Sequence, residues 1–279
     1  MQALQDLETG VMLWAGRDSL AEMKSFGVRS GQIGLAEDTP LTDAFRNGWK
    51  EALAREQFTL VTVFCAYEGE NYADIPTVER TVGFIPPATR ERREKRTLEV
   101  SDFAAELGVP GIACHIGFVP HDALDPNYIA VRAMVRRVCD HAAGHGQTFA
   151  LETGQEPAPV LLRFLEDVGR ENLKINFDPA NMILYGTGDP IEALDVLGPQ
   201  VVSVHAKDGD WPPRGRPGAL GTERPLGQGA VGMERFVAKL KQVGYRGSLN
   251  VEREVENQQE RLRDIAAGIA LLNSIRSRS

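Results

Sequence analysis

Four polar residues each stand near the C-terminal end of a separate apolar run. They are Glu152 in TFALET, Asp178 in LKINFD, His205 in VVSVHAKD and Glu252 in SLNVERE. Three carboxylates and one imidazole make an oxygen-rich donor set, which favours Mn²⁺ first, with Mg²⁺ and Co²⁺ as alternatives, over structural zinc. One such residue alone often only caps a helix, but four in consecutive units predict a single divalent-metal site.

Successive side chains of a strand face opposite ways, so every second residue of each run lies on the same face as the candidate metal ligand. In VVSVHAKD, for example, Val202 and Val204 fall on the face opposite to His205. The other three runs divide in the same way into an apolar face and a polar face. Strands of this kind predict a closed barrel with a polar interior mouth and a covering of helices.

Eight strand candidates alternate with eight segments of helical spacing, which predicts one α/β domain over residues 1–279, a (β/α)8 TIM barrel. The strands are expected at 11–15, 31–36, 59–66, 111–117, 147–153, 173–178, 201–207 and 248–253. The helices are expected at 18–27, 41–56, 88–108, 127–144, 157–169, 189–198, 231–244 and 258–275. A doubly wound open sheet is the alternative, but no GxGxxG follows the first strand.

Composition limits the partners and the compartment. A net charge of -8 over 279 residues argues against a nucleic-acid partner and favours a small or neutral substrate. Cys65, Cys114 and Cys139 are far apart and form no CxxC, so neither a disulfide framework nor a zinc knuckle is indicated. The sequence shows neither a basic leader nor an apolar run of roughly 18 residues. We therefore expect a cytoplasmic protein without a membrane partner, and a homo-oligomer stays open.

Two connections are longer than such folds usually need, 68–87 after the third strand and 208–230 after the seventh. Both emerge on the catalytic face, so we expect them to form lids or substrate walls. Trp211 and Arg214 in the second segment are candidates for substrate contacts. In the same segment Gly227 and Gly229 could cradle a phosphate, but without a flanking Lys a tight turn is the preferred interpretation.

The pair His141 and His145 has the HxxxH spacing of a metal-binding helix. It precedes the fifth strand and therefore belongs to the opposite, stability face of the barrel. Positive charge at a helix C-terminus is favourable in itself, so the pair is interpreted as structural.

The strings ALETGQE, INFDPANMILYG, VVSVHAKDGDW, PLGQGAVGMERF and GYRGSLNVERE, in this order, resemble the sugar phosphate isomerase/epimerase superfamily of xylose isomerase-like TIM barrels. This superfamily includes D-tagatose 3-epimerase and inosose dehydratase, and the resemblance runs from about residue 110 to the end. It implies that the four polar residues are the metal ligands and that Glu152 and Glu252 also form the acid/base pair.

Three further residues are candidates for substrate contacts. His115 ends the fourth strand with inward parity, and Lys207 shares the inward face of His205, with a salt bridge to Glu254 or Asp178 as its alternative role. Asn181 stands where D-tagatose 3-epimerase has a histidine that contacts substrate hydroxyls. The identity of the sugar is therefore not implied by the resemblance.

The expected chemistry is a metal-dependent isomerisation or epimerisation of a ketose or keto-glycoside through an enediolate, with one glutamate on each face of the substrate. Loss of a β-leaving group from the same enediolate would instead give a dehydratase or lyase. An endonuclease IV-like repair enzyme is a remote alternative, because those sites use several metals and many histidines and this chain has five histidines. A non-catalytic sugar-binding barrel would not require two flanking bases.

Overall fold

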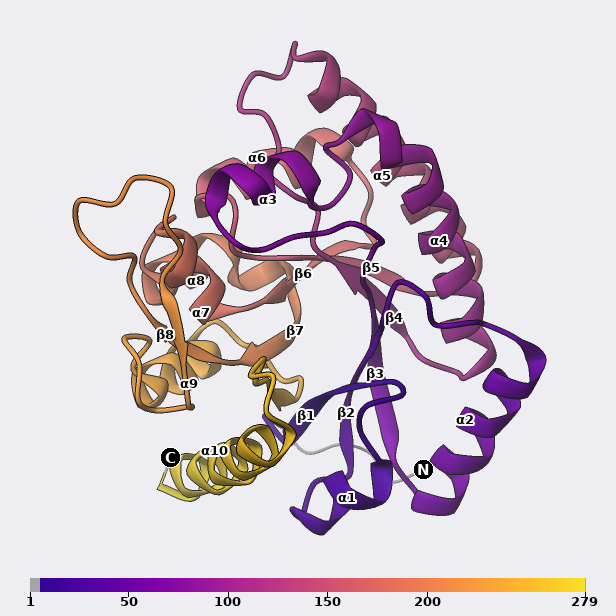
Figure 1. Ribbon diagram of the computed structural model, residues 1–279, viewed down its shortest axis with the longest axis vertical. Helices are drawn as coiled ribbons and strands as arrows, with labels where there is room; N and C mark the ends of the chain where they lie inside the picture. Colours follow the sequence, from indigo (N-terminus) through magenta and orange to yellow (C-terminus); the bar gives the residue numbers. More distant parts are fainter. Residues whose placement is uncertain (1–5, 279) are drawn as a thin grey trace.

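Eight parallel strands close into one barrel in the computed structural model, which describes residues 6–278 (Figure 1). In ring order the strands are β1 (Thr9–Trp14), β10 (Leu249–Val251), β7 (Val201–Ala206), β6 (Leu173–Phe177), β5 (Thr148–Glu152), β4 (Gly111–Cys114), β3 (Thr59–Cys65) and β2 (Ser30–Leu35). All eight predicted strands are present, so the predicted TIM barrel is confirmed.

A helix follows each barrel strand and covers its outer face. These helices are α1 (Leu20–Ser25), α2 (Asp43–Glu56), α4 (Pro87–Glu106), α5 (Pro126–Gly144), α6 (Ala158–Val168), α8 (Pro190–Leu197), α9 (Met233–Gln242) and α10 (Gln258–Arg278). All eight correspond to predicted segments. None of the helices in the described part of the chain is long and apolar enough to cross a membrane.

The structure adds elements that the sequence reading treated as connections. They are the helices α3 (Ile75–Thr81) and α7 (Pro179–Tyr185), the 3₁₀ turn η1 (Gly198–Gln200), and an antiparallel ribbon of β8 (Asp208–Asp210) and β9 (Thr222–Arg224). The interpretation of 68–87 and 208–230 as connections without secondary structure was therefore incomplete. α7 does carry start and stop signals, since Asp178 caps it before Pro179 and Gly186 ends it at φ 70°. Its seven residues are too few for a periodic pattern to be recognised.

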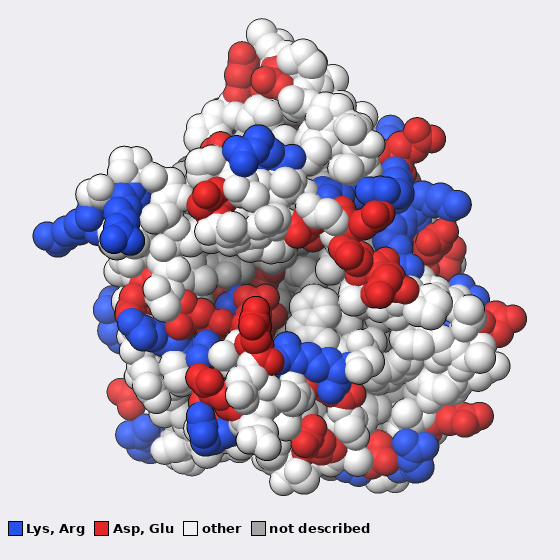
Figure 2. All heavy atoms as spheres, in the orientation of Figure 1, with Lys and Arg blue, Asp and Glu red and all other residues white. Residues whose placement is uncertain are grey.

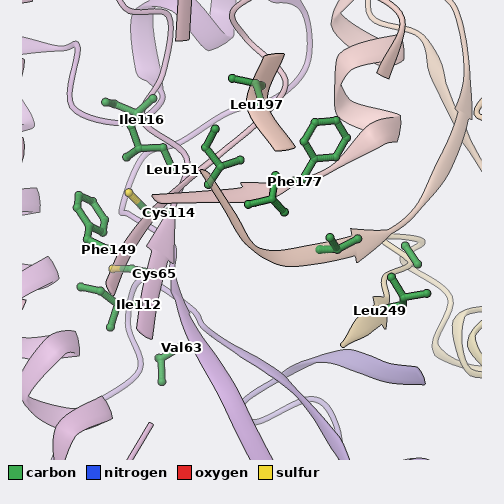
Figure 3. Packing of buried hydrophobic residues seen from close by; sticks show 14 of the residues in the cluster. Val63, Cys65, Ile112, Cys114, Ile116, Phe149, Leu151, Phe177, Leu197 and Leu249 are labelled. Carbon is green, nitrogen blue, oxygen red and sulfur yellow. The ribbon is translucent and has the colours of Figure 1, made fainter. Parts of the chain in front are cut away.

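The main hydrophobic core lies between the strands and the surrounding helices, as Figure 3 shows for the outer sides of β4, β5 and β6. Ile112, Phe149 and Phe177 alternate with inward residues, as the parity argument predicts. Val202 departs from it. A register shift in the pairing of β6 with β7 leaves this side chain 39% exposed instead of sharing the core with Val204.

The barrel interior is apolar on one side and polar on the other. Met12, Phe64, Ala113 and Ala150 form a small inner cluster with the ring of Trp14 beside it. Across the interior, Asn176 on β6 links β2 and β7, because its Oδ1 accepts from Gln32 Nε2 at 3.0 Å and from Ser203 Oγ at 2.5 Å. The polar half of the interior lies directly beneath the C-terminal strand ends.

The last helix is tied to the first strand by a buried ion pair. Arg261 on α10 donates from Nη1 to Asp18 Oδ1, and the two side chains are 1% and 0% exposed. The other oxygen of Asp18 accepts from the backbone N–H of Trp14 at 2.7 Å. The start of α10 is therefore joined to the loop that follows β1.

Replacement of Asp18 by alanine should lower the free energy of unfolding by about 3–5 kcal/mol, because Arg261 would remain buried without its counter-charge. Urea unfolding followed by circular dichroism measures the change. The matched control is Asp6→Ala, which removes the partner of Arg246 from a pair with side chains 69% and 64% exposed and should have little effect. Equal effects of the two substitutions would contradict the role assigned to the buried pair.

Candidate metal centre and substrate cavity

The four predicted ligands converge at the C-terminal mouth of the barrel. Glu152 is the last residue of β5, Asp178 follows β6, His205 lies in β7 and Glu252 follows β10. One donor atom of each residue lies within 4.8 Å of the corresponding atoms of the others, and all four residues are buried. The residues that the sequence singled out therefore form one cluster.

His205 lies at the centre of this cluster. Its Nδ1 is 2.6 Å from Glu152 Oε1, 3.1 Å from Glu252 Oε2 and 3.8 Å from Asp178 Oδ2. Yet within residues 6–278 neither ring nitrogen makes a hydrogen bond of acceptable geometry, and Asp178 Oδ2 accepts no hydrogen bond. Buried polar atoms left unpaired in this way are costly. A divalent cation among them would take a lone pair from His205 Nδ1 and one from Asp178 Oδ2, so the residues fit the metal that the fold family implies.

Asp178 divides its two oxygens between structure and site. Its Oδ1 accepts from the backbone N–H of Asn181 at 2.9 Å and so caps α7. Its main chain is fixed by Thr153, whose hydroxyl donates to Asp178 O and accepts from Asp178 N. The second oxygen is therefore held in place and points to the cluster with no other hydrogen-bond partner in the described chain.

Glu152 has partners on two sides besides His205. His115 Nε2 lies 2.7 Å from Oε2, and Asn176 Nδ2 donates to Oε1 at 3.3 Å. Burial raises the pKa of Glu152, but the charges of His115 and His205 outweigh it and lower that pKa below its ordinary value. Burial likewise lowers the pKa of His115, and Glu152 more than offsets this, raising it to about 9. His115 therefore carries a proton at neutral pH.

Glu252 has Lys207 as its cationic partner, with Nζ 3.2 Å from Oε2. Lys207 also pairs with Glu254 and lies 3.7 Å from Asp178 Oδ2, so the salt bridges considered from the sequence are present. Burial raises the pKa of Glu252, while His205 and Lys207 lower it to about 2 overall. Each of the two glutamates thus has its own proton-bearing neighbour, His115 for one and Lys207 for the other.

A cavity of about 410 Å³ lies over these residues. Its lining includes Glu152, Glu252, His115 and Asn181, together with the rings of Trp14, Phe64, Tyr72 and Tyr185 and the carboxyl groups of Glu70, Glu223 and Glu254. Figure 2 shows a hollow in this face of the molecule with Asp and Glu atoms gathered beside it. The cavity is large enough for a sugar and combines an aromatic side with an acidic side.

The two long segments meet above the cavity. The backbone N–H of Ile75, at the start of α3, donates to the carbonyl of Gly218 at 2.9 Å. Val78 and Val82 pack with Tyr185 and Leu220 in a separate apolar cluster. Segments 68–87 and 208–230 therefore form one roof over the cavity, and both contribute residues to its lining.

Not every candidate lies in the cavity. His115 and Asn181 line it. Lys207 does not line it but forms ion pairs with Glu252 and Glu254, which do. Trp211 is 45% exposed, Arg214 is exposed, and neither belongs to the lining, so their roles as substrate contacts stay predictions. The sequence reading missed Glu70, Tyr72, Tyr185 and Glu223. Glu70 and Tyr72 lie in segment 68–87, Glu223 lies in segment 208–230, and Tyr185 lies in α7 after β6. Their positions after strand ends were the only sequence signal for a place in the cavity.

The glycine-rich end of the second long segment is a closed turn. Gly227 has φ 85°, as the turn interpretation requires, and its N–H donates to Asp208 Oδ2 at 2.9 Å. Gly209 and Val231 donate to Asp208 Oδ1 at 2.9 and 3.1 Å. Gly229 has no positive φ, but an added Cβ would meet Asp208 Oδ1 at 2.3 Å. The carboxylate of Asp208 thus takes the N–H groups that a phosphate would need.

The sequence model of the xylose isomerase-like TIM barrel family matches residues 20–275. This chain belongs to that family. A crystal structure of a xylose isomerase domain protein from Planctomyces limnophilus is 40% identical, covers 98% of each chain and superposes with a TM-score of 0.93. An uncharacterized protein of Methanocaldococcus jannaschii is 26% identical over 183 residues, and the match spans 60% of this chain and 60% of that relative. The resemblance to the sugar phosphate isomerase/epimerase superfamily is confirmed.

Two more distant structures share the fold. One is a D-allulose 3-epimerase from Methylomonas sp. in complex with D-allulose, with 20% identity, a TM-score of 0.69 and coverage of 100% of this chain and 99% of the other. The second is a probable 3-DHS dehydratase from Bacillus anthracis, with 16% identity, a TM-score of 0.67 and coverage of 95% and 99%. The same fold therefore occurs in an epimerase and in a probable dehydratase.

Metal binding by this protein should release protons at neutral pH. Burial lowers the pKa of His205, but Glu252 and Glu152 raise it well above its ordinary value, so the metal-free site holds a proton that ligation must displace. The affinity for Mn²⁺ should therefore rise by up to about tenfold per pH unit until the pH passes this raised pKa. Calorimetric titration in two buffers of different ionisation enthalpy counts the released protons.

The control for this measurement is His121→Ala, because His121 is exposed and is not one of the candidate ligands at the barrel mouth. Its proton release should equal that of the wild type. A heat of binding independent of the buffer at pH 7 would contradict a protonated His205.

Proposed function

We propose that this protein is a divalent-metal-dependent isomerase or epimerase that acts on an unphosphorylated ketose or keto-glycoside through an enediolate. One observation carries the proposal: two buried glutamates lie at the base of the cavity, three strands apart around the ring, with His205 between them. Glu152, Asp178, His205 and Glu252 would hold the metal, with Mn²⁺ as the first expectation and Mg²⁺ or Co²⁺ as alternatives.

When bound, the metal would supply the positive charge that stabilises the enediolate oxygens. The chain itself moves the proton. One glutamate takes the proton from the carbon next to the carbonyl, and the other returns a proton to that carbon from the opposite face or to its neighbour. Glu152 and Glu252 project from β5 and the end of β10 and can therefore approach a substrate from different sides.

The mechanism requires one glutamate to be anionic and the other side of the substrate to have a proton available. His115 and Lys207 are the groups that can supply this proton. Both glutamates have lowered pKa values and are anionic in the metal-free site. His115 lies 2.7 Å from Glu152, and Lys207 lies 3.2 Å from Glu252. Each glutamate can exchange its proton with its neighbour, so either can begin as the base while the other side serves as the acid.

The charges around the cavity support an unphosphorylated substrate. Five carboxyl groups line it, those of Glu70, Glu152, Glu223, Glu252 and Glu254, against the single cationic side chain of His115 among the lining residues. The N–H groups of the glycine-rich turn are already bound by Asp208. A phosphate dianion would meet repulsion without compensating donors, and a DNA backbone would meet the same obstacle. Sugar hydroxyls can donate to these carboxylates, and the aromatic rings can pack against the apolar face of a sugar ring.

Glu152→Gln and Glu252→Gln should each reduce kcat by about 10²-fold or more while part of the metal binding is retained, because the amide keeps an oxygen donor and loses the acid/base function. In deuterated water the wild-type enzyme should place one solvent deuterium on the carbon next to the carbonyl. Mass spectrometry and NMR of the product from a ketose and 3-keto-glycoside panel with Mn²⁺ provide the measurement.

Glu260→Gln, in the first turn of α10 with a side chain 43% exposed, is the matched control and should keep full activity. Product without solvent deuterium would indicate hydride transfer and refute the two-glutamate enediolate route. An unsaturated product would instead assign the same site to a dehydratase or lyase.

A ketose should be turned over with a kcat/KM about 10²-fold or more above that of its terminal phosphate ester, because the ester would enter an acidic cavity. Initial rates for matched sugar and sugar phosphate pairs measure this ratio. Inorganic phosphate at millimolar concentration should not inhibit. A preference for the phosphate ester would overturn the substrate class and leave the acid/base assignment to be judged by the glutamate variants.

A further inference from the structure

A second cluster of metal-ligand side chains lies outside the barrel mouth, on the helices α4 and α5. His141 lies in the last turn of α5 and His145 directly follows this helix. Their Nε2 atoms lie 2.7 and 2.9 Å from the same atom, Oδ1 of Asp102 on α4. Together with the mouth cluster, this is one of two groups in the described residues whose donor atoms all lie within 4.8 Å of one another.

We propose that Asp102, His141 and His145 bind a transition-metal ion, Zn²⁺ or a neighbouring ion such as Ni²⁺ or Cu²⁺, that clamps α4 to α5. Two imidazoles and one carboxylate are the donors that these ions prefer, whereas the oxygen-rich mouth cluster suits harder ions. The proposal concerns a site separate from the catalytic one and does not rest on the proposed function.

The separation of the donor atoms is close to that of ligands around one ion. A histidine nitrogen lies about 2.0–2.1 Å and a carboxylate oxygen about 2.0–2.2 Å from Zn²⁺, so neighbouring ligands stand about 3.0–3.4 Å apart. The two nitrogen–oxygen distances here, 2.7 and 2.9 Å, need only a few tenths of an ångström of opening. The imidazole planes are inclined at 74° with centroids 5.2 Å apart, so the rings approach the shared oxygen from different directions.

Solvent access allows an ion to enter and to complete its coordination with water. The side chains of His141, His145 and Asp102 are 32%, 35% and 48% exposed. They lie toward the C-terminal ends of helices whose N-termini follow the catalytic ends of β3 and β4, hence toward the opposite face of the barrel. An ion here cannot reach the substrate cavity, and its role is to join two helices.

The alternative is a proton-bridged cluster, in which both imidazoles donate N–H groups to the carboxylate at the negative ends of the two helices. The same arrangement of two Nε2 atoms around Asp102 Oδ1 then needs no ion. The two states differ in what they bind, because only the first predicts a stoichiometric ion that depends on both histidines.

Zn²⁺ titration of the full-length protein against a chromophoric chelator provides the test, with the mouth cluster disabled by Asp178→Ala and His205→Ala. We expect one remaining equivalent of Zn²⁺ and a loss of affinity of about 10²-fold or more on adding His141→Ala or His145→Ala. Adding His121→Ala, an exposed histidine outside the cluster, should leave the affinity unchanged. No bound Zn²⁺ at micromolar concentration, or binding that is indifferent to His141→Ala, would overturn the proposal.

A second measurement uses the otherwise unaltered protein, in case the mouth variants fail to fold. With the mouth saturated by Mg²⁺, one equivalent of Cu²⁺ should give an electron paramagnetic resonance spectrum with hyperfine structure from two imidazole nitrogens. This structure should be lost in His141→Ala, and the melting temperature should rise on adding Zn²⁺ in the wild type but not in that variant. Identical spectra for both proteins would refute the site.

Discussion

Three carboxylates buried within a few ångströms of one another are the constraint on which this structure depends. Glu152, Asp178 and Glu252 are 2%, 0% and 6% exposed, so each carboxylate has given up most of its hydration. Removal of charges from water is tolerated only where opposite charge or donors are close. His205, Lys207 and His115 supply part of this charge. Within residues 6–278, atoms of Asp178 and His205 still lack hydrogen bonds, so the compensation is incomplete. A divalent cation held as proposed would complete it.

The barrel meets this constraint by holding Glu152 and Asp178 in place with hydrogen bonds from neighbouring strands and from the start of α7. Asn176 links β2 and β7 through its carbonyl oxygen and supports Glu152 through its amide. Asp178 is held by the cap of α7 and by the hydroxyl of Thr153. These groups are locked by strands and a helix start rather than by loops, so the donor positions are set before any ligand arrives.

The roof has a different origin from the base. Segments 68–87 and 208–230 contribute the aromatic and acidic walls and meet through Ile75 and Gly218. The barrel and the four candidate ligands come from strand ends, while these walls come from the long connections. The walls of the cavity can therefore change without disturbing the four candidate ligands. This explains how one fold can serve proteins as different as a D-allulose 3-epimerase and a probable dehydratase.

The sequence by itself determined the barrel, its eight strand-helix units and the convergence of the four polar residues, because strand parity and strand ends are local properties of the chain. It could not show α7 or the β8–β9 ribbon, which are too short to carry a periodic pattern. Nor could it show that Val202 is exposed, that Asp208 takes the N–H groups of the glycine-rich turn, or that Asp102 stands beside His141 and His145. Only the tertiary structure decided these features, since each depends on register or on contacts between residues that closure of the barrel and packing of its helices bring together.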